Sequence, residues 1–63
     1  MIKLRYDLIG AFNNGVSKHP QEDIKELGLK AISYKPVPIA DCILIDVLNI
    51  NGVELPNYIS EIK

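Results

Sequence analysis

The stretch CILIDVLNING, from Cys42 to Gly52, largely decides the fold of this chain because it is dominated by branched aliphatic residues. Such residues favour a β-strand, in which successive side chains point to opposite faces. The two expected faces are Leu44, Asp46, Leu48 and Ile50 on one side, and Ile43, Ile45 and Val47 on the other. Both faces are apolar. A chain of 63 residues must therefore either cover the second face itself or leave it for a partner.

The end of this stretch, Asn51-Gly52, is a strong signal for a two-residue hairpin turn. We predict a hairpin over 42–55, with Leu48, Ile50, Val53 and Leu55 pointing inward near its tip. Two alternatives account for the residues further back. A β-bulge near Asp46-Val47 would turn Ile43 and Ile45 inward and place Asp46 in water. A regular strand would instead leave a second apolar face, to be covered by a helix or by another subunit.

The N-terminal segment predicts one strand and one helix. Apolar residues alternate with charged ones over 2–8, which is typical of a half-buried strand. The segment from Gly10 to His19 is rich in glycine and asparagine and is expected to be a loop. Pro20 suits the first turn of a helix and Gly28 suits the position after its end, so we expect a helix from Pro20 to Leu27. Leu29 could close over its apolar face.

A further strand is expected over Ala31–Lys35, at a sheet edge or ending there, because Pro36 cannot donate to a ladder. The segment 56–63 fits a short strand slightly better than a helix. The sequence thus predicts a single small domain, 1–63, of the α+β class. Its mainly antiparallel sheet would have four to five strands and one short helix, in the order β-α-β-β-β. A small β-barrel with one helical turn is the alternative, and the first two strands, joined through the helix, could lie parallel as a right-handed crossover.

Size and composition limit the ways in which this chain can be stabilised and the places where it can act. Domains this small are marginally stable, and a single cysteine with a single histidine provides neither an internal disulfide nor a four-ligand zinc site. Self-association is the remaining common way for so small a domain to gain stability. No secretory signal or apolar run of about 20 residues is present, so we expect a cytoplasmic protein that does not enter a membrane.

Motifs for chemistry are incomplete. Gly10 and Gly15 have the spacing of a phosphate-binding loop, but Val16 stands where the lysine is required. Cys42 and His19 could form a nucleophilic pair only within a cleft that so small a chain hardly provides, and Cys42 is more simply a buried apolar residue. We therefore expect no enzyme activity, no cofactor and no metal.

The expected function is a non-catalytic interaction or regulatory domain that acts through protein–protein contact, as a homodimer joined through the 42–55 hairpin. Its partner-binding residues would be Ile43, Ile45, Asp46, Val47, Asn49 and Glu54. The alternative is a small nucleic-acid-binding domain. Residues 1–35 hold six basic residues against four acidic ones, whereas 36–62 hold no basic residue. The rim of such a domain would be Lys3, Arg5, Lys30 and Lys35.

Overall fold

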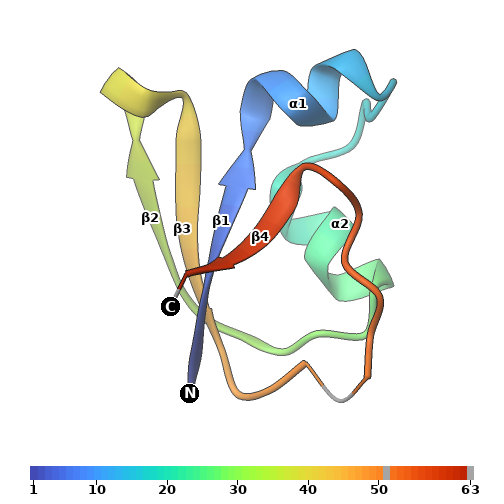
Figure 1. Ribbon diagram of the computed structural model, residues 1–63, viewed down its shortest axis with the longest axis vertical. Coiled ribbons are helices and arrows are strands. Elements are labelled where there is room, and N and C mark those ends of the chain that lie inside the picture. The colour runs from blue at the N-terminus through green and yellow to red at the C-terminus, as the bar shows by residue number, and fades with distance from the viewer. Residues whose placement is uncertain (51, 63) are drawn as a thin grey trace.

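The computed structural model describes residues 1–50 and 52–62, which form four strands, two α-helices and one 3₁₀ helix. Figure 1 shows a sheet with α1 at one end of it. In chain order the elements are β1 (Ile2–Asp7), α1 (Leu8–Asn13), α2 (Pro20–Glu26), β2 (Ala31–Val37), the 3₁₀ helix η1 (Pro38–Ala40), β3 (Cys42–Val47) and β4 (Ile59–Ile62).

The sheet is open and antiparallel, with the strand order β2-β3-β1-β4. An open sheet excludes the barrel alternative, because β2 and β4 are edges that do not meet. Both β1 and β2 pair antiparallel with β3, so they run in the same direction. The first two strands are therefore parallel to each other, as the sequence allowed, with β3 between them.

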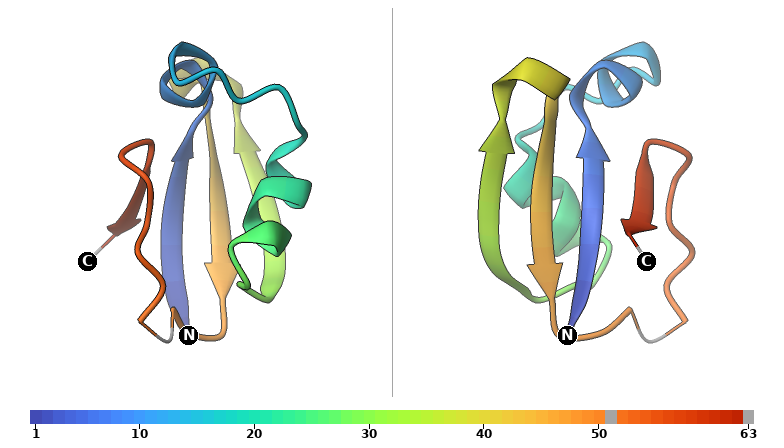
Figure 2. Two further views of the ribbon diagram at one scale, coloured as in Figure 1. Left: turned by 90° about the vertical axis from the view of Figure 1, so that its right-hand side faces the viewer. Right: turned by 60° about the vertical axis from the view of Figure 1, so that its left-hand side comes forward.

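Helix α2 covers one face of the sheet, and the core lies between them (Figure 2). Leu4 and Tyr6 of β1 point into this core, because they alternate with the exposed or half-buried Lys3 and Arg5. Ile24 of α2 is fully buried against them. The predicted strand at the N-terminus and the predicted helix after Pro20 are thus both present. Leu29 is buried and closes over the end of the helix, and Gly28 adopts the left-handed conformation, with φ +84°.

The strand β3 settles the question raised by its two apolar faces. It is regular, and Ile45 and Val47 are both fully buried in the core on the side of α2. Their own chain therefore covers the second face. The irregularity in the sheet lies opposite Asp46 and Val47 but in the partner strand β2, where the register shifts between Ala31 and Ser33. Of the two alternatives, the bulge at Asp46-Val47 is therefore wrong, and the regular strand with a second face covered by the helix is what the structure has.

The hairpin expected over 42–55 does not form as a pair of strands. Asn51 lies outside the described residues; around it, Val53 N donates a hydrogen bond of 2.6 Å to Ile50 O. Residues 53–56 belong to no strand. Strand β3 ends at Val47, before the residues next to the expected turn, and its two sides are already paired with β1 and β2. The actual hairpin joins β2 to β3 through η1, where Asp41 takes the left-handed conformation with φ 50°.

Helix α1 is a second correction, since a loop was expected from Gly10 onward. Ala11 is buried in the core and holds the helix against the sheet. The Asn14 side chain donates a hydrogen bond of 2.7 Å to Gly10 O and so satisfies a carbonyl of the last turn. The final segment does form the expected strand, β4, and Ile59 anchors it in the core.

Candidate functional site

A buried cluster of two tyrosines and one aspartate is the main polar feature of the interior. The hydroxyls of Tyr6 and Tyr58 each donate a hydrogen bond of 2.7 Å to Oδ2 of Asp23, whose exposed fraction is only 4%. The two rings pack edge to face, with centroids 5.4 Å apart and an interplanar angle of 75°. Burial, followed by the hydrogen bond to Asp23, raises the pKa of Tyr58 to about 12. The same causes, in the same order, raise the pKa of Tyr6 still further.

This cluster holds the fold together rather than offering a reactive group. Both phenols are protonated donors, and the carboxylate they share is closed off by them. Sequence reasoning missed it, because Asp23 looked like a residue that complements the dipole of the helix. Its two partners are 17 and 35 residues away in sequence, and no local pattern connects them.

The residues expected to bind a partner divide between two faces of the molecule. Ile45 and Val47 are fully buried and thus covered by their own chain, and Ile43 is partly buried and packs against the same core. Asp46 points to the opposite side of the sheet, where it accepts a hydrogen bond of 2.9 Å from Ser33 Oγ and lies 3.9 Å from Lys3 Nζ. It is thus both on an outer face and paired.

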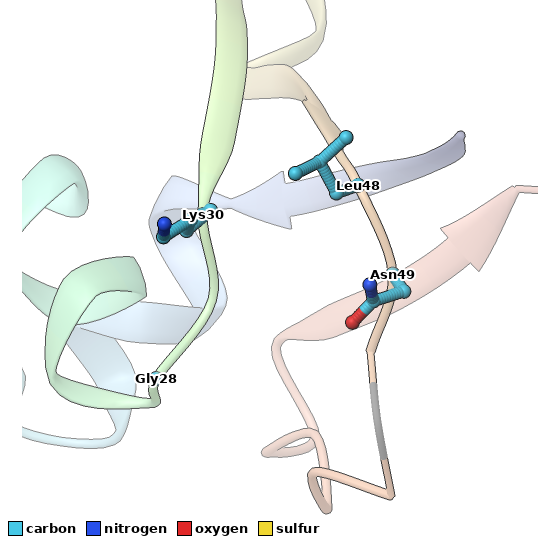
Figure 3. Close-up of a pocket in the computed structure, with 4 residues that line it drawn as sticks. All are labelled: Gly28, Lys30, Leu48 and Asn49. Carbon is cyan, nitrogen blue, oxygen red and sulfur yellow. The ribbon is translucent and has the colours of Figure 1, made fainter.

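The remaining two expected partner-binding residues, Asn49 and Glu54, are exposed on the segment that follows β3. Asn49 lines a pocket of about 170 Å³ together with Gly28, Lys30 and Leu48. In Figure 3 the side chains of Leu48 and Asn49 point toward the segment that carries Lys30, whereas the Lys30 ammonium points away from them. Ligand pockets are usually larger, at about 300–1,000 Å³, and hold several converging polar groups. This pocket therefore does not define a ligand site.

The face of the sheet opposite α2 carries three of the four predicted basic residues. We call it the open face and define it by Lys3, Arg5, Ser33, Lys35, Leu44 and Asp46. The right-hand view of Figure 2 shows no helix or loop in front of β2, β3 and β1 on this side. Lys30 is not part of it, since it precedes β2 and its ammonium points toward α2 (Figure 3).

A second surface is apolar and lies at one end of the sheet. Helix α1 and the 3₁₀ helix η1 both lie at this end in Figures 1 and 2, and Leu8 N donates a hydrogen bond of 3.0 Å to Asp41 O between them. Phe12 is 78% exposed and Ile39 is 96% exposed. We call this surface the apolar end and define it by Leu8, Ile9, Phe12 and Ile39.

The candidate chemical groups are dispersed. Cys42 is a free, buried cysteine at the start of β3, and His19 is an exposed residue before α2. Within residues 1–50 and 52–62, no three His, Cys, Asp or Glu side chains gather closely enough to hold a metal ion. In the same part of the chain, no helix has the length and apolar character needed to cross a membrane.

Comparisons with known proteins add no assignment. No protein-family model matches this chain, and neither the curated proteins nor the solved structures contain a significant match. The fold class and the candidate surfaces are therefore defined by this chain alone. It is a small α+β domain with a four-stranded open antiparallel sheet, and its two candidate surfaces are the apolar end and the basic open face.

Proposed function

We propose that this protein is a non-catalytic interaction domain that associates with a second copy of itself through the apolar end. The observation that carries this proposal is the exposure of Ile9 and Phe12 on α1, together with Ile39 on η1 at the same end of the sheet. Monomeric proteins commonly expose single apolar residues, whereas apolar side chains that gather in one patch are often functional. The four side chains of the apolar end are all exposed, and the two helices that carry them, α1 and η1, lie at the same end of the sheet.

The composition of α1 supports the same proposal. Its sequence, LIGAFN, contains no charged residue, and only Ala11 of it is buried. A helix that is apolar on all sides is normally covered on all sides. Since the core covers only the side of Ala11, Ile9 and Phe12 are left for another molecule.

A second copy is the partner that best fits the charge of this surface. No charged residue occurs over 8–17 or over 36–40, the two stretches that contain the apolar end. In a two-fold dimer each patch contacts its own copy, so a charged patch would face a like charge. An uncharged patch avoids this repulsion. The area of four side chains is small relative to the roughly 800 Å² per partner of standard interfaces, so the dimer should be weak and concentration-dependent.

The regulatory role expected of the domain follows from this weak association, because an assembly that forms over a range of concentrations can respond to the amount of protein.

Nucleic-acid binding is less well supported than self-association. The basic residues of β1 are not beside those of β2, and Lys30 lies away from the open face. Tyr6 and Tyr34 point toward the core side, so among the described residues the open face has no aromatic side chain for a base to stack on.

Sedimentation velocity over a wide range of protein concentrations tests the proposal. We expect the wild type to shift from monomer to dimer as the concentration rises, and Ile9→Lys and Phe12→Lys to remain monomeric. The matched control is Ile32→Lys, because Ile32 is 53% exposed, close to the 54% of Ile9, but lies in β2 near the other end of the sheet. Circular dichroism would verify that each variant folds. A wild type that stays monomeric at every concentration would refute self-association.

A further inference from the structure

The open face has an ordered arrangement of charge that the apolar end lacks. Register places Lys35, Leu44 and Arg5 in one row across β2, β3 and β1. A second row contains Ser33, Asp46 and Lys3. Both rows point away from α2, because their neighbours along each strand are the buried core residues.

The two rows differ in how their charges are satisfied. In the second row Asp46 accepts a hydrogen bond from Ser33 and lies near Lys3, so the charges are partnered within the row. In the first row neither Arg5 nor Lys35 takes part in an ion pair with any of the residues the structure describes. Asp7, the next residue of this parity in β1, has its carboxylate against Gly10 of α1. The row thus presents two cations without a carboxylate.

The spacing of this row suits a particular ligand. Arg5 and Lys35 are separated by one strand, which places their backbones about 10 Å apart. Leu44 lies between them and is half-buried. Arg5 is also half-buried, and a guanidinium in such a position favours a planar carboxylate that accepts two hydrogen bonds. The row therefore matches an aliphatic side chain flanked by two carboxylates.

We propose that the open face binds an extended acidic segment of another protein, through carboxylates that contact Arg5 and Lys35 and an aliphatic side chain that packs on Leu44. This function goes beyond self-association and uses a different face of the domain. A protein segment fits better than a nucleic acid, because the centre of the row is aliphatic and offers a base no stacking partner.

Fluorescence anisotropy with a labelled peptide of the sequence Gly-Glu-Ser-Leu-Ser-Glu-Gly tests this proposal, because the two glutamates and the leucine share one face of an extended chain. We expect micromolar binding at low salt that weakens as salt is added. Arg5→Gln and Lys35→Gln should each weaken binding about tenfold, since each removes a charge-assisted contact. Leu44→Ser should also weaken it, by about fivefold. The control variant Lys25→Gln removes an exposed cation from α2, on the other side of the sheet, and should bind as the wild type does.

Two comparisons make the test decisive. The same peptide with glutamine in place of glutamate should not bind, and an oligothymidylate of equal net charge should bind more weakly than the acidic peptide. Equal or tighter binding of the oligothymidylate, or an equal loss in Lys25→Gln and Arg5→Gln, would overturn the proposal. Phe12→Lys separates this surface from self-association: it should retain full peptide affinity. Loss of affinity in that variant would place the peptide at the apolar end instead.

Discussion

Tyr58 and Asp23 are 35 residues apart in the chain, and a hydrogen bond of 2.7 Å from the Tyr58 hydroxyl joins them in the folded domain. The Tyr58 carbonyl also accepts a hydrogen bond of 2.8 Å from Asp7 N at the end of β1. Since Tyr6 of β1 donates to the same oxygen of Asp23, one carboxylate ties α2, β1 and the segment before β4 together. The position of the last strand thus depends on a contact far from it in sequence.

Removal of either phenol hydroxyl tests how much these hydrogen bonds to Asp23 contribute to the free energy of unfolding. We expect Tyr58→Phe to lower the free energy of unfolding by about 1.5–3 kcal/mol, the usual contribution of a hydrogen bond to a charged group. Tyr6→Phe should cost a similar amount. Because both phenols serve one carboxylate, the effect of the double variant should differ from the sum of the two single effects. Urea unfolding followed by circular dichroism measures all three. Additive losses would contradict a shared role of Asp23.

The same cluster predicts how stability depends on pH. Burial and the hydrogen bond to Asp23 raise the pKa of Tyr58 from 10.0 to about 12, and the pKa of Tyr6 is also raised. A raised pKa in the folded state means that the unfolded chain loses its proton first. Stability is therefore fully retained below pH 10, and it falls as the pH rises through the folded pKa of about 12.

Two measurements check this alkaline loss. A spectrophotometric titration of the native protein should show little tyrosinate at pH 10, because burial raises the pKa of Tyr34 as well and the chain has three tyrosines. Urea midpoints should decline more gently with pH in Tyr58→Phe than in the wild type, since one titrating group is gone. A wild-type midpoint that declines at mildly acidic pH and not above pH 10 would point to other groups.

The two faces of β3 should respond very differently to truncation. Ile45 is fully buried, so Ile45→Ala should cost about 2–5 kcal/mol. That loss approaches the whole stability of so small a domain. Leu44 is half-buried on the open face, and Leu44→Ala should cost less than Ile45→Ala because its surroundings include water. Thermal unfolding of both variants measures the difference. Similar losses would show that the open face is covered in solution.

The sequence predicts those elements whose signals are local. Alternation identified β1, and Pro20 with Gly28 identified α2, because these patterns depend on residues close together in the chain. Helix α1 was missed since its glycine and asparagines resemble a turn, and only the burial of Ala11 explains it. The hairpin at Asn51-Gly52 was predicted from a strong local signal, but the pairing of β3 with β1 and β2 is a property of the whole sheet.

The candidate surfaces were partly visible in the sequence. Lys3, Arg5 and Lys35 were identified as basic residues, but only register shows that Leu44 separates Arg5 from Lys35. The apolar end was not predicted, because Phe12 belongs to a segment expected to be a loop and Ile39 follows the predicted end of a strand at Lys35. Burial in the core of Ile45 and Val47 was one of two alternatives that the pattern left open.

Gly10 provides a last test, of the contact between α1 and the segment before β4. Alanine normally stabilises a helix relative to glycine by about 1 kcal/mol. At Gly10, however, an added Cβ would lie 2.9 Å from Asp7 Oδ2 and 3.1 Å from Tyr58 Cβ. The Asp7 carboxylate can rotate away, but Tyr58 is held by its ring, its hydroxyl and its carbonyl. We therefore expect Gly10→Ala to lower the urea midpoint despite the better helix propensity. A raised midpoint would mean that α1 can shift away from Tyr58 without loss, and that the two segments are not tightly packed.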